Sequence, residues 1–352
     1  MPRFENDIMG LIPAKDWLNV GFDVTRQNDP IDTLFGDLRT DNLIAEWETI
    51  ASEYQIPSMA QFHGFDTESQ TTVRVPIDSH NVEKGLIKVK INQSERMRAL
   101  LNRGVRRDAL YDYVLDDGIN LAEQVFTRSK VAKNELLATG KVTIKENDLN
   151  LTVDYGVPSA NFNYTVDLST SGDVAGDIQK IVDAALAKGV VITGMVTSRK
   201  NITAMRKNEN VQKAINGNYN VGALVRRSAL DAYLDEEFGI GTIITNDLVY
   251  ALPRKVAANG RLTNTTKRYF PEDKITFFGT VNGNTLGTGL WGNPPEMDGI
   301  DMQGRNSAEF PYVYLSQWQE KDPAVIWTKA SALFMPVLYN PDSLYGATVT
   351  GE

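Results

Sequence analysis

The 352-residue chain carries 36 basic and 45 acidic residues, a net charge of −9, and 42% apolar residues. These values predict an ordinary globular protein of two or three domains, and the acidic balance argues against a dedicated nucleic-acid-binding protein. The chain has no cysteine and only two histidines, which excludes disulfides, thiolate chemistry and Cys-based zinc sites and leaves most hydrolase mechanisms short of residues.

The chain also lacks the apolar stretches that direct proteins into or across membranes. No apolar run approaches the ~20 residues that a membrane-spanning helix needs. Glu5 and Asp7 interrupt the region where a signal peptide would carry its apolar core. We therefore expect a protein that is made and kept in a cytoplasm and has no membrane partner.

Residues 1–42 have the character of an arm rather than a domain, because their apolar side chains follow no sustained period. Asp29 followed by Pro30 predicts a short helix start with the aspartate as its N-cap. Residues 29–53 carry seven acids and one base, a local charge of −6. A segment with so much negative charge is expected to have a basic partner elsewhere.

Residues 43–92 predict a long polar excursion between two regular segments. The stretch 43–54 fits both a helical face and an alternating strand, so its residues alone leave that choice open. Residues 86–92 alternate apolar and polar side chains and predict a strand. Residues 55–80 are polar apart from a short apolar alternation at 73–77, which predicts a loop built on a β-ribbon. A loop of this length usually has a function or reaches a partner.

The strongest periodic signal predicts one long helix over residues 106–138. Apolar residues recur along it at spacings of four and seven, and Gly140 follows as a C-terminal cap. At 1.5 Å per residue the helix would be about 50 Å long. Its charges are segregated, with +7 on residues 84–107 and −5 on residues 108–123. Because positive charge before a helix start opposes the helix dipole, we expect the acidic residues 29–53 to pack against residues 84–107, across subunits.

The rest of the chain predicts a hairpin, an α/β unit and an apolar tail. Residues 142–153 alternate as two strands around a polar turn. Ser228 and Asp231 resemble a capping box, and Gly239 is placed to stop the helix that they begin. The expected helices cover residues 173–188, two pieces that begin at Ser198 and Asn210, and residues 228–238. The expected strands cover residues 190–196, 240–245 and the tail at 323–349.

One motif has the letters of a nucleotide-binding loop but not its context. Residues 287–292 match the pattern G-x-G-x-x-G, which needs a strand before it and a helix after it. Asn293-Pro294-Pro295 follows, so no helix can begin in the required register. We interpret residues 279–304 as a glycine-rich loop that holds no nucleotide.

No group of residues has the spacing of an active site. Acidic clusters at 116–117 and 235–237 fall on expected helices, where adjacent side chains point apart. The acids at 296–301 lack the spacing of an EF-hand. His63 and His80 both lie in the polar excursion, where hydrogen bonding is the usual role. We therefore expect no catalytic residue, no cofactor and no metal.

Three segments are the most telling for a comparison with known families: Leu136-Leu137-Ala138-Thr139-Gly140-Lys141-Val142, Val153-Asp154-Tyr155-Gly156-Val157-Pro158 and Met335-Pro336-Val337. In these segments and in the order of its elements, the chain resembles the major capsid proteins of tailed phages, and more specifically the lambda-type capsid protein E family, which has the Hong Kong ninety-seven fold. The first two segments are similar to the family's L-x-x-G-K and to its pattern of an apolar residue, Asp, an aromatic residue and Gly. The resemblance covers nearly the whole chain.

This resemblance implies an α+β phage capsid fold. It also implies that the ambiguous stretch at 43–54 is a strand. The implied parts are an N-terminal arm (1–42), peripheral-domain strands with an extended β-ribbon loop (43–92, the loop at about 52–83), the rest of the peripheral domain with its spine helix (93–166, the helix at about 106–138), an α/β axial domain (167–322) and a return to the peripheral domain (323–352).

The function implied by the resemblance is structural. Many copies would form pentamers and hexamers of an icosahedral head shell around double-stranded DNA, assembled in the host bacterial cytoplasm and retained in the virion. The implied partners are further copies of the chain, a portal, a scaffold, a decoration protein of the lambda type, and packaged DNA without sequence-specific contacts. The candidates for inter-subunit contact are Asp32, Asp37, Asp41, Phe62, Phe65, Arg74, Arg103, Arg106 and Arg107.

Two other functions fit parts of the pattern. An encapsulin-like shell protein of a cellular compartment shares the fold, and a neighbouring terminase or portal gene would favour the phage. A soluble α/β nucleotide-binding enzyme could use the glycine-rich segment, and nucleotide-dependent thermal stabilisation would favour it.

Some members of this fold join a loop lysine to an asparagine of a neighbouring subunit. Residues 52–83 contain no lysine, and Arg74 is their only base. A guanidinium stays protonated and is a poor nucleophile. Lys84 lies at the base of the excursion, where it could not reach across. We therefore expect a shell without covalent cross-links.

Overall fold

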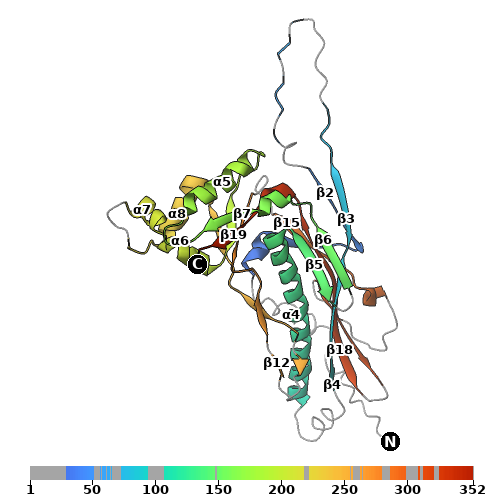
Figure 1. The fold of residues 1–352 in the computed structure, drawn as a ribbon. Coiled ribbons are helices and arrows are strands. Elements are labelled where there is room, and N and C mark those ends of the chain that lie inside the picture. The colour runs from blue at the N-terminus through green and yellow to red at the C-terminus, as the bar shows by residue number, and fades with distance from the viewer. Residues whose placement is uncertain are drawn as a thin grey trace, which may run out of the picture.

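The computed structural model shows two lobes, each with its own sheet and apolar core, and a long loop that projects from the first lobe (Figure 1). The structure describes residues 29–50, 56, 58–60, 62–63, 65, 73–93, 107–146, 149–217, 222–253, 255–256, 262–263, 265–279, 286–298, 308–309, 312–320 and 325–351.

The first lobe, here the long-helix lobe, is a six-stranded sheet packed against α4 (Arg107–Thr139). The long strand β18 organises the sheet, because it pairs with β4 on one edge and with β17 and then β15 on the other. Helix α4 lies against β18 and β4. The six strands are β1 (Phe35–Arg39), β4 (Gly85–Gln93), β15 (Gly287–Gly292), β16 (Ala308–Glu309), β17 (Tyr314–Gln319) and β18 (Ile326–Leu338).

Helix α4 confirms the expected long helix to within one residue at each end. Its apolar face buries Leu121, Val125 and Leu136, as the spacing predicts. Gly140 ends the helix at φ 70°, in the left-handed region that glycine adopts without strain. A Cβ there would also lie 3.0 Å from the side chain of Val157, so both backbone angle and space require glycine.

Within the segment at 43–54, the residues that the structure describes contain a strand, as the resemblance implies, and residues 51–54 lie outside the described residues. β2 (Ile44–Thr49) pairs with β3 (Asp78–Glu83) as an antiparallel ribbon at the base of the projecting loop. Residues 73–77 have no regular structure, although their alternation of apolar and polar side chains predicts a strand. The paired part of the ribbon is therefore confined to the base of the loop, next to the lobe. The expected hairpin is confirmed as β5 (Lys141–Glu146) and β6 (Leu149–Asp154).

The second lobe, here the four-helix lobe, confirms the expected α/β unit. Its five strands run in the order β7-β19-β14-β8-β9. Its strands are β7 (Tyr164–Asp167), β8 (Gly194–Thr197), β9 (Thr242–Thr245), β14 (Lys274–Phe278) and β19 (Leu344–Thr350), and its helices are α5 (Val174–Leu186), α6 (Arg199–Lys207), α7 (Glu209–Asn216) and α8 (Arg227–Phe238). Smaller elements are the pairs β10 (Val249–Ala251) with β13 (Thr266–Arg268) and β11 (Lys255–Val256) with β12 (Leu262–Thr263), and the short helices η3 (Pro30–Thr33), η4 (Ser159–Phe162), η5 (Pro295–Asp298) and η6 (Pro341–Ser343).

Helix caps explain where most of these helices begin. Asp173 caps α5 by accepting from the Gly176 amide, and Ser198 caps α6 by accepting from the Asn201 amide. The predicted capping box at Ser228 and Asp231 is wrong. Helix α8 begins one residue earlier, and Arg227 holds the Asp231 carboxylate at 3.3 Å instead.

The interpretation of residues 287–292 as part of a loop is also wrong. They form β15, a buried strand between β1 and β18. Glycine is needed there because neighbouring groups lie very close. A Cβ at Gly289 would meet the Asp37 carboxylate and the Lys133 side chain, and one at Gly292 would lie 3.1 Å from the Lys84 ammonium nitrogen. Gly289 and Gly292 therefore make room for charged side chains, among other neighbours, rather than for a phosphate.

The apolar tail is divided between the two sheets. β18 joins the long-helix lobe, as the resemblance implies, whereas β19 lies in the middle of the other sheet, between β7 and β14. The turn at Pro341–Ser343 separates the two strands. β19 is buried along most of its length, as are strands of both sheets, so its apolar pattern alone does not show which sheet it joins.

Candidate assembly surfaces

The projecting loop is anchored by an aromatic stack at its base. Trp47 of β2 stacks on His80 of β3, with ring centroids 5.3 Å apart, and also lies against Tyr155. The Thr49 hydroxyl and the His80 Nε2 atom are 2.8 Å apart and share a hydrogen bond. His80 therefore has a structural role at the foot of the loop.

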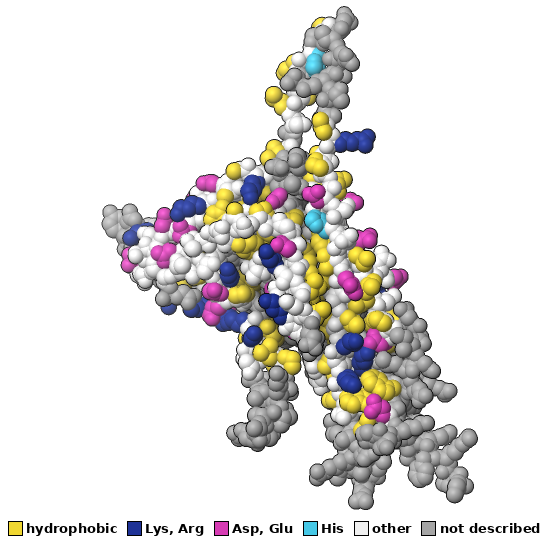
Figure 2. Space-filling view, turned by 45° about the vertical axis from the view of Figure 1, so that its right-hand side comes forward, with side chains coloured by type: hydrophobic (Ala, Val, Ile, Leu, Met, Phe, Trp, Pro, Cys, Tyr) yellow, Lys and Arg dark blue, Asp and Glu magenta, His cyan; other side chains and the backbone are white. Residues whose placement is uncertain are grey.

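Beyond this base, the described part of the loop exposes large apolar side chains. Phe62 and Phe65 are fully exposed, and Met59 and Val73 nearly so. Figure 2 shows these apolar side chains along the projection, away from both lobes. Removing such a side chain from water yields about 1.5–3 kcal/mol, so a loop of this composition is stabilised by a surface that covers it.

Two of the arm acids bind a buried lysine of the same chain. The Lys133 ammonium, on α4, lies 2.9 Å from the Asp32 carboxylate and 3.0 Å from that of Asp37. The Trp291 indole donates to Asp37 at 2.9 Å, and the Lys133 side chain is only 2% exposed. Burial by itself lowers the pKa of Lys133, but the Asp37 and Asp32 carboxylates outweigh it and raise that pKa.

Sequence reasoning missed this lysine. It expected the acidic segment to pack against residues 84–107, and Lys133 lies outside that range. The available signal was its position directly after Ala132 and three residues before Leu136, on the apolar face of the helix. A lysine on such a face needs a buried partner.

A second polar cluster joins the arm to both lobes. The Asp29 carboxylate accepts hydrogen bonds from the Ile31 amide at 3.0 Å, the Asn134 side chain at 2.8 Å and the Asn246 side chain at 3.0 Å. Asn134 belongs to α4, whereas Asn246 follows β9 of the four-helix lobe, and the two amides are themselves bonded at 2.9 Å. All three side chains are buried, and burial raises the pKa of Asp29. One carboxylate thus fixes three separate segments against one another.

Lys84 is held at the base of the loop by neutral oxygens. Its ammonium donates to the Thr40 hydroxyl at 2.5 Å and to the carbonyls of Thr40, Asn42 and Trp291 at 3.1, 2.6 and 3.3 Å. Burial lowers the pKa of Lys84, although the nearby Asp41 opposes that shift. The basic segment therefore meets the arm within one chain at this lysine, through hydrogen bonds rather than ion pairs.

The other candidate residues have different surroundings. Asp41 accepts a hydrogen bond from the Asn293 side chain at 2.9 Å. Arg74 is exposed on the loop. Arg103 and Arg106 lie outside the described residues, and Arg107 begins α4 in a part of the helix whose side chains the structure does not describe.

Two of the segments that carry the family resemblance meet in the core. The Tyr155 hydroxyl, fully buried, donates to the Pro336 carbonyl at 2.7 Å. This bond ties the loop after β6 to the long strand β18. The motif residues therefore act in packing.

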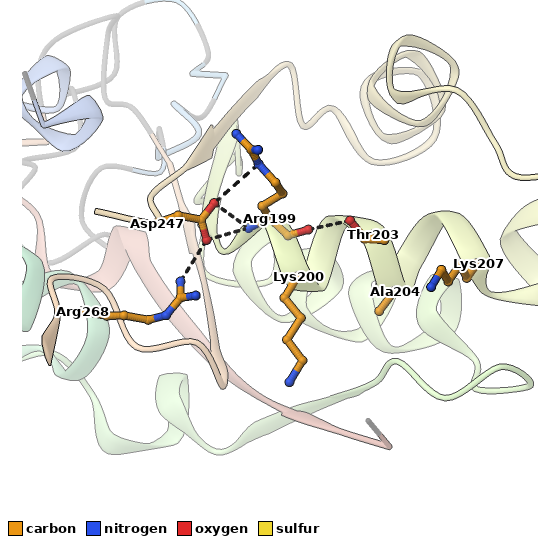
Figure 3. A pocket seen from close by; sticks show the side chains of 7 residues that line it. All are labelled: Arg199, Lys200, Thr203, Ala204, Lys207, Asp247 and Arg268. Atoms are coloured by element: carbon orange, nitrogen blue, oxygen red, sulfur yellow. Dashed lines mark hydrogen bonds and ion pairs between the residues drawn. The ribbon is translucent and has the colours of Figure 1, made fainter. Parts of the chain in front are cut away.

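A basic hollow of about 690 Å³ lies on the four-helix lobe, at the start of α6. Figure 3 shows Arg199 and Arg268 reaching Asp247 from two sides. Lys200 and Lys207 of the same helix complete the basic lining. Among the residues that the structure describes, no three His, Asp or Glu side chains gather as a metal site, and no helix is long and apolar enough to span a membrane.

Comparison with known proteins places these features in a family. Residues 55–349 match the family described as phage major capsid protein E. The fold is similar to that of a putative prophage capsid protein from Escherichia coli, with a TM-score of 0.54, 14% identity, and coverage of 96% of this chain and 97% of the other. It is also similar to a phage-related protein from Bordetella bronchiseptica, with a TM-score of 0.52, 9% identity, and coverage of 94% and 95%. At these identities the structural likeness concerns the fold. Comparison with individual curated proteins gives no match.

Proposed function

This chain belongs to the phage major capsid protein E family, and from that membership we propose that copies of it assemble as pentamers and hexamers into a closed icosahedral head around double-stranded DNA. It is a structural protein of the virion shell and not an enzyme. The nucleotide-binding alternative is not supported, because residues 287–292 are themselves a buried strand and the element described directly after them is the four-residue 3-10 helix η5, not the α-helix that the motif needs at that position. Membership of a phage family favours the phage head over a cellular compartment.

The observation that carries this proposal is the projecting loop. A monomer gains nothing by exposing Phe62 and Phe65 completely on a loop far from its own cores. A neighbouring copy in a shell offers the surface that would cover them. The further proposed partners are a portal, a scaffold and a decoration protein, and contacts with packaged DNA are expected to be independent of sequence.

Replacing both loop phenylalanines tests this proposal. We expect Phe62→Ser with Phe65→Ser to abolish shells in sedimentation and electron microscopy, because the loop loses its apolar contact with the neighbour. The monomer should keep its thermal unfolding midpoint, since both side chains are exposed before assembly. The control is Leu149→Ser with Val249→Ser, which removes two half-exposed apolar side chains from β6 and β10. Normal shells from the loop variant would refute the proposed role of the loop.

The position of Lys84 gives a second prediction. Lys84 is 2% exposed and its ammonium is already bound by four oxygens, so it is unavailable for reaction with a neighbour. With no lysine at 52–83, the loop supplies no nucleophilic amine. Mature particles boiled in detergent should therefore run as one band near 39.1 kDa. A ladder of covalent oligomers would contradict this expectation.

A further inference from the structure

The structure shows which charges of the expected contact between residues 29–53 and 84–107 remain available to a second copy. The described acids of the arm are already bound by side chains of the same chain, and the Lys84 ammonium is bound by four oxygens. Glu46 and Glu48 of β2 are exposed, and in the described part of the chain their carboxylates have no ion-pair or hydrogen-bond partner. These two acids are therefore free to bind a basic surface of another molecule.

One face of the ribbon at the base of the loop is acidic. Side chains alternate between the two faces of a strand, and the exposed positions of β2 are Ile44, Glu46 and Glu48. The register of β2 with β3 places Glu83 directly opposite Ile44, on the same face, and Glu83 is exposed as well. This face, here the acidic ribbon face, carries three acids and no base.

Strand β4 follows β3 directly and has a basic face. Ile87 and Val89 pack against the core of the long-helix lobe. The residues that alternate with them, Leu86, Lys88 and Lys90, therefore lie on the opposite face, and all three are exposed. In the part of the chain that the structure describes, no carboxylate binds either lysine. These three residues form the basic strand face.

The neighbours of the basic strand face leave its charge in place. Lys329, directly opposite Lys90 on β18, is itself paired with Glu296. The Lys90 ammonium lies 4.0 Å from the centre of the Trp327 ring. The face of an aromatic ring attracts a cation without cancelling its charge. Lys88 and Lys90 therefore still attract an acidic partner.

The two faces are too far apart to bind each other within one chain. Asn81 lies opposite Glu46 in the ribbon, and Lys88 follows seven positions later along β3 and β4. At 3.3 Å per residue this is about 23 Å, far beyond the reach of an ion pair. In Figure 2, acidic side chains lie on the flank of the long-helix lobe just below the loop, and basic side chains lie lower on the same flank.

Each face also offers apolar surface to a partner. Ile44 of the acidic ribbon face is 45% exposed, and Leu86 of the basic strand face is 38% exposed. Lysines on an edge strand can serve only to prevent that edge from pairing, and β4 lies at the edge of its sheet. That role would not require an acidic face on the adjoining ribbon, whereas docking requires both faces.

We propose that the acidic ribbon face of one copy docks against the basic strand face of a second copy. Opposite charges across an interface steer the two partners together and fix their register. Because every chain carries both faces, each copy can offer one face and receive the other. This inference rests on the proposed assembly, and it assigns two surfaces that join one copy of the chain to the next.

Charge reversal on either face tests this contact. The acid variant carries Glu46→Lys, Glu48→Lys and Glu83→Lys, and the base variant carries Lys88→Glu and Lys90→Glu. Each should lower the fraction of chains in rings or shells by at least about tenfold, because like charges then meet at every such contact. Combining all five changes in one chain exchanges the charges of the two faces and should restore assembly.

An equimolar mixture of the two variants gives a second readout. The acid variant is positive on both faces and the base variant is negative on both, so each is complementary to the other and repels itself. Mixing should therefore recover assembly that neither variant shows alone. With one variant isotopically labelled, native mass spectrometry should find both variants in the same assemblies.

Salt dependence and a companion variant separate repulsion from damage to the fold. Raising the salt concentration from 0.05 M to 0.5 M shortens the Debye length from roughly 14 to 4 Å. The difference in assembly between the wild type and each variant should therefore shrink, whereas the loss caused by a folding defect would persist. Lys88→Glu alone keeps the contact between Lys90 and Trp327 and should weaken assembly in the same direction, with an unchanged thermal unfolding midpoint.

The matched control makes the same change of charge elsewhere. It carries Asp235→Lys, Glu236→Lys and Glu237→Lys at exposed positions of α8 and should assemble as the wild type does. An equal loss of assembly in this control and in the acid variant would show that general charge, and not the acidic ribbon face, is responsible.

The outcomes separate this inference from the proposal beneath it. If the wild-type chain forms rings or shells and both charge-reversed variants do so equally well, the docking contact is wrong while the proposed function stands. If the wild-type chain forms neither under any condition, the proposed function fails with it. If the variant with all five changes folds but does not regain assembly, the pairing of these two faces is overturned.

Discussion

Replacing Asp32 and Asp37 together by asparagine is expected to lower the free energy of unfolding by about 3–5 kcal/mol at neutral pH, since it leaves a buried charge unpaired. Lys133 is almost completely buried, and these two carboxylates are its partners. Asparagine keeps the size of the side chain and removes its charge. Chemical denaturation of the unassembled chain measures the loss.

The pH dependence of the free energy of unfolding shows whether the unpaired Lys133 ammonium causes this loss. The two carboxylates raise the pKa of Lys133 in the folded wild type, so their stabilising effect is complete below the ordinary lysine pKa of 10.5 and is lost as pH rises through the higher folded value. In the double variant, Lys133 is still buried but has lost both carboxylates, so burial lowers the pKa of Lys133. The variant should therefore gain stability as pH rises from 7 toward about 10, where the lysine loses its charge.

The matched control removes two carboxylates that have no such partner. Glu46 and Glu48 are exposed on β2, and changing both to glutamine should alter stability by about 0.5 kcal/mol or less. An equal loss in both double variants would show that general charge, and not the buried lysine, is responsible. A variant of Asp32 and Asp37 whose stability does not recover at alkaline pH would contradict the account as well.

Asp29→Ala is expected to have the next largest effect, about 3 kcal/mol, because it leaves buried amide donors without an acceptor. Asn134 and Asn246 are 0% and 1% exposed and both donate to this carboxylate. Since these donors come from different lobes, hydrogen exchange should also speed up at the C-terminal end of α4 and after β9 together. Faster exchange in one lobe alone would contradict the role of Asp29 in holding the two lobes together.

Asp29→Asn serves as the companion variant, since it keeps one acceptor and should cost less than the alanine. Burial raises the pKa of Asp29 above its ordinary value of 3.8. The carboxyl of the wild type therefore contributes most to stability below 3.8, and this contribution is lost as pH rises through the folded pKa. As the solution is acidified, the wild type should therefore gain stability relative to Asp29→Asn. A difference that is constant with pH would argue against a buried, ionised Asp29.

The regular elements with local signals were predictable. The long helix shows one apolar period and a glycine stop, and the hairpin at 141–154 shows strict alternation around a turn. These signals depend on residues a few positions apart, so a sequence shows them directly. The resemblance to capsid proteins added the order of the lobes, which periodicity cannot supply.

Long-range packing explains what was missed. The strand β15 looks like a loop because its glycines are needed for close contacts with residues distant in sequence, among them Asp37 and Lys133 beside Gly289 and Lys84 beside Gly292. Lys133 was missed as the partner of Asp32 and Asp37 for the same reason, since local charge counting favours a run of cations over a single buried lysine. The contact expected between residues 29–53 and residues 84–107 across subunits stays a prediction. The hydrogen bonds of Asp29 to both lobes and the place of β19 in its sheet also produce no pattern among neighbouring residues of the sequence.

Electron microscopy of the purified full chain, over a range of protein concentrations, tests the central claim most directly. The account predicts closed icosahedral shells, or rings with fivefold and sixfold symmetry. A preparation that contains folded monomers alone at every concentration and salt condition would contradict it.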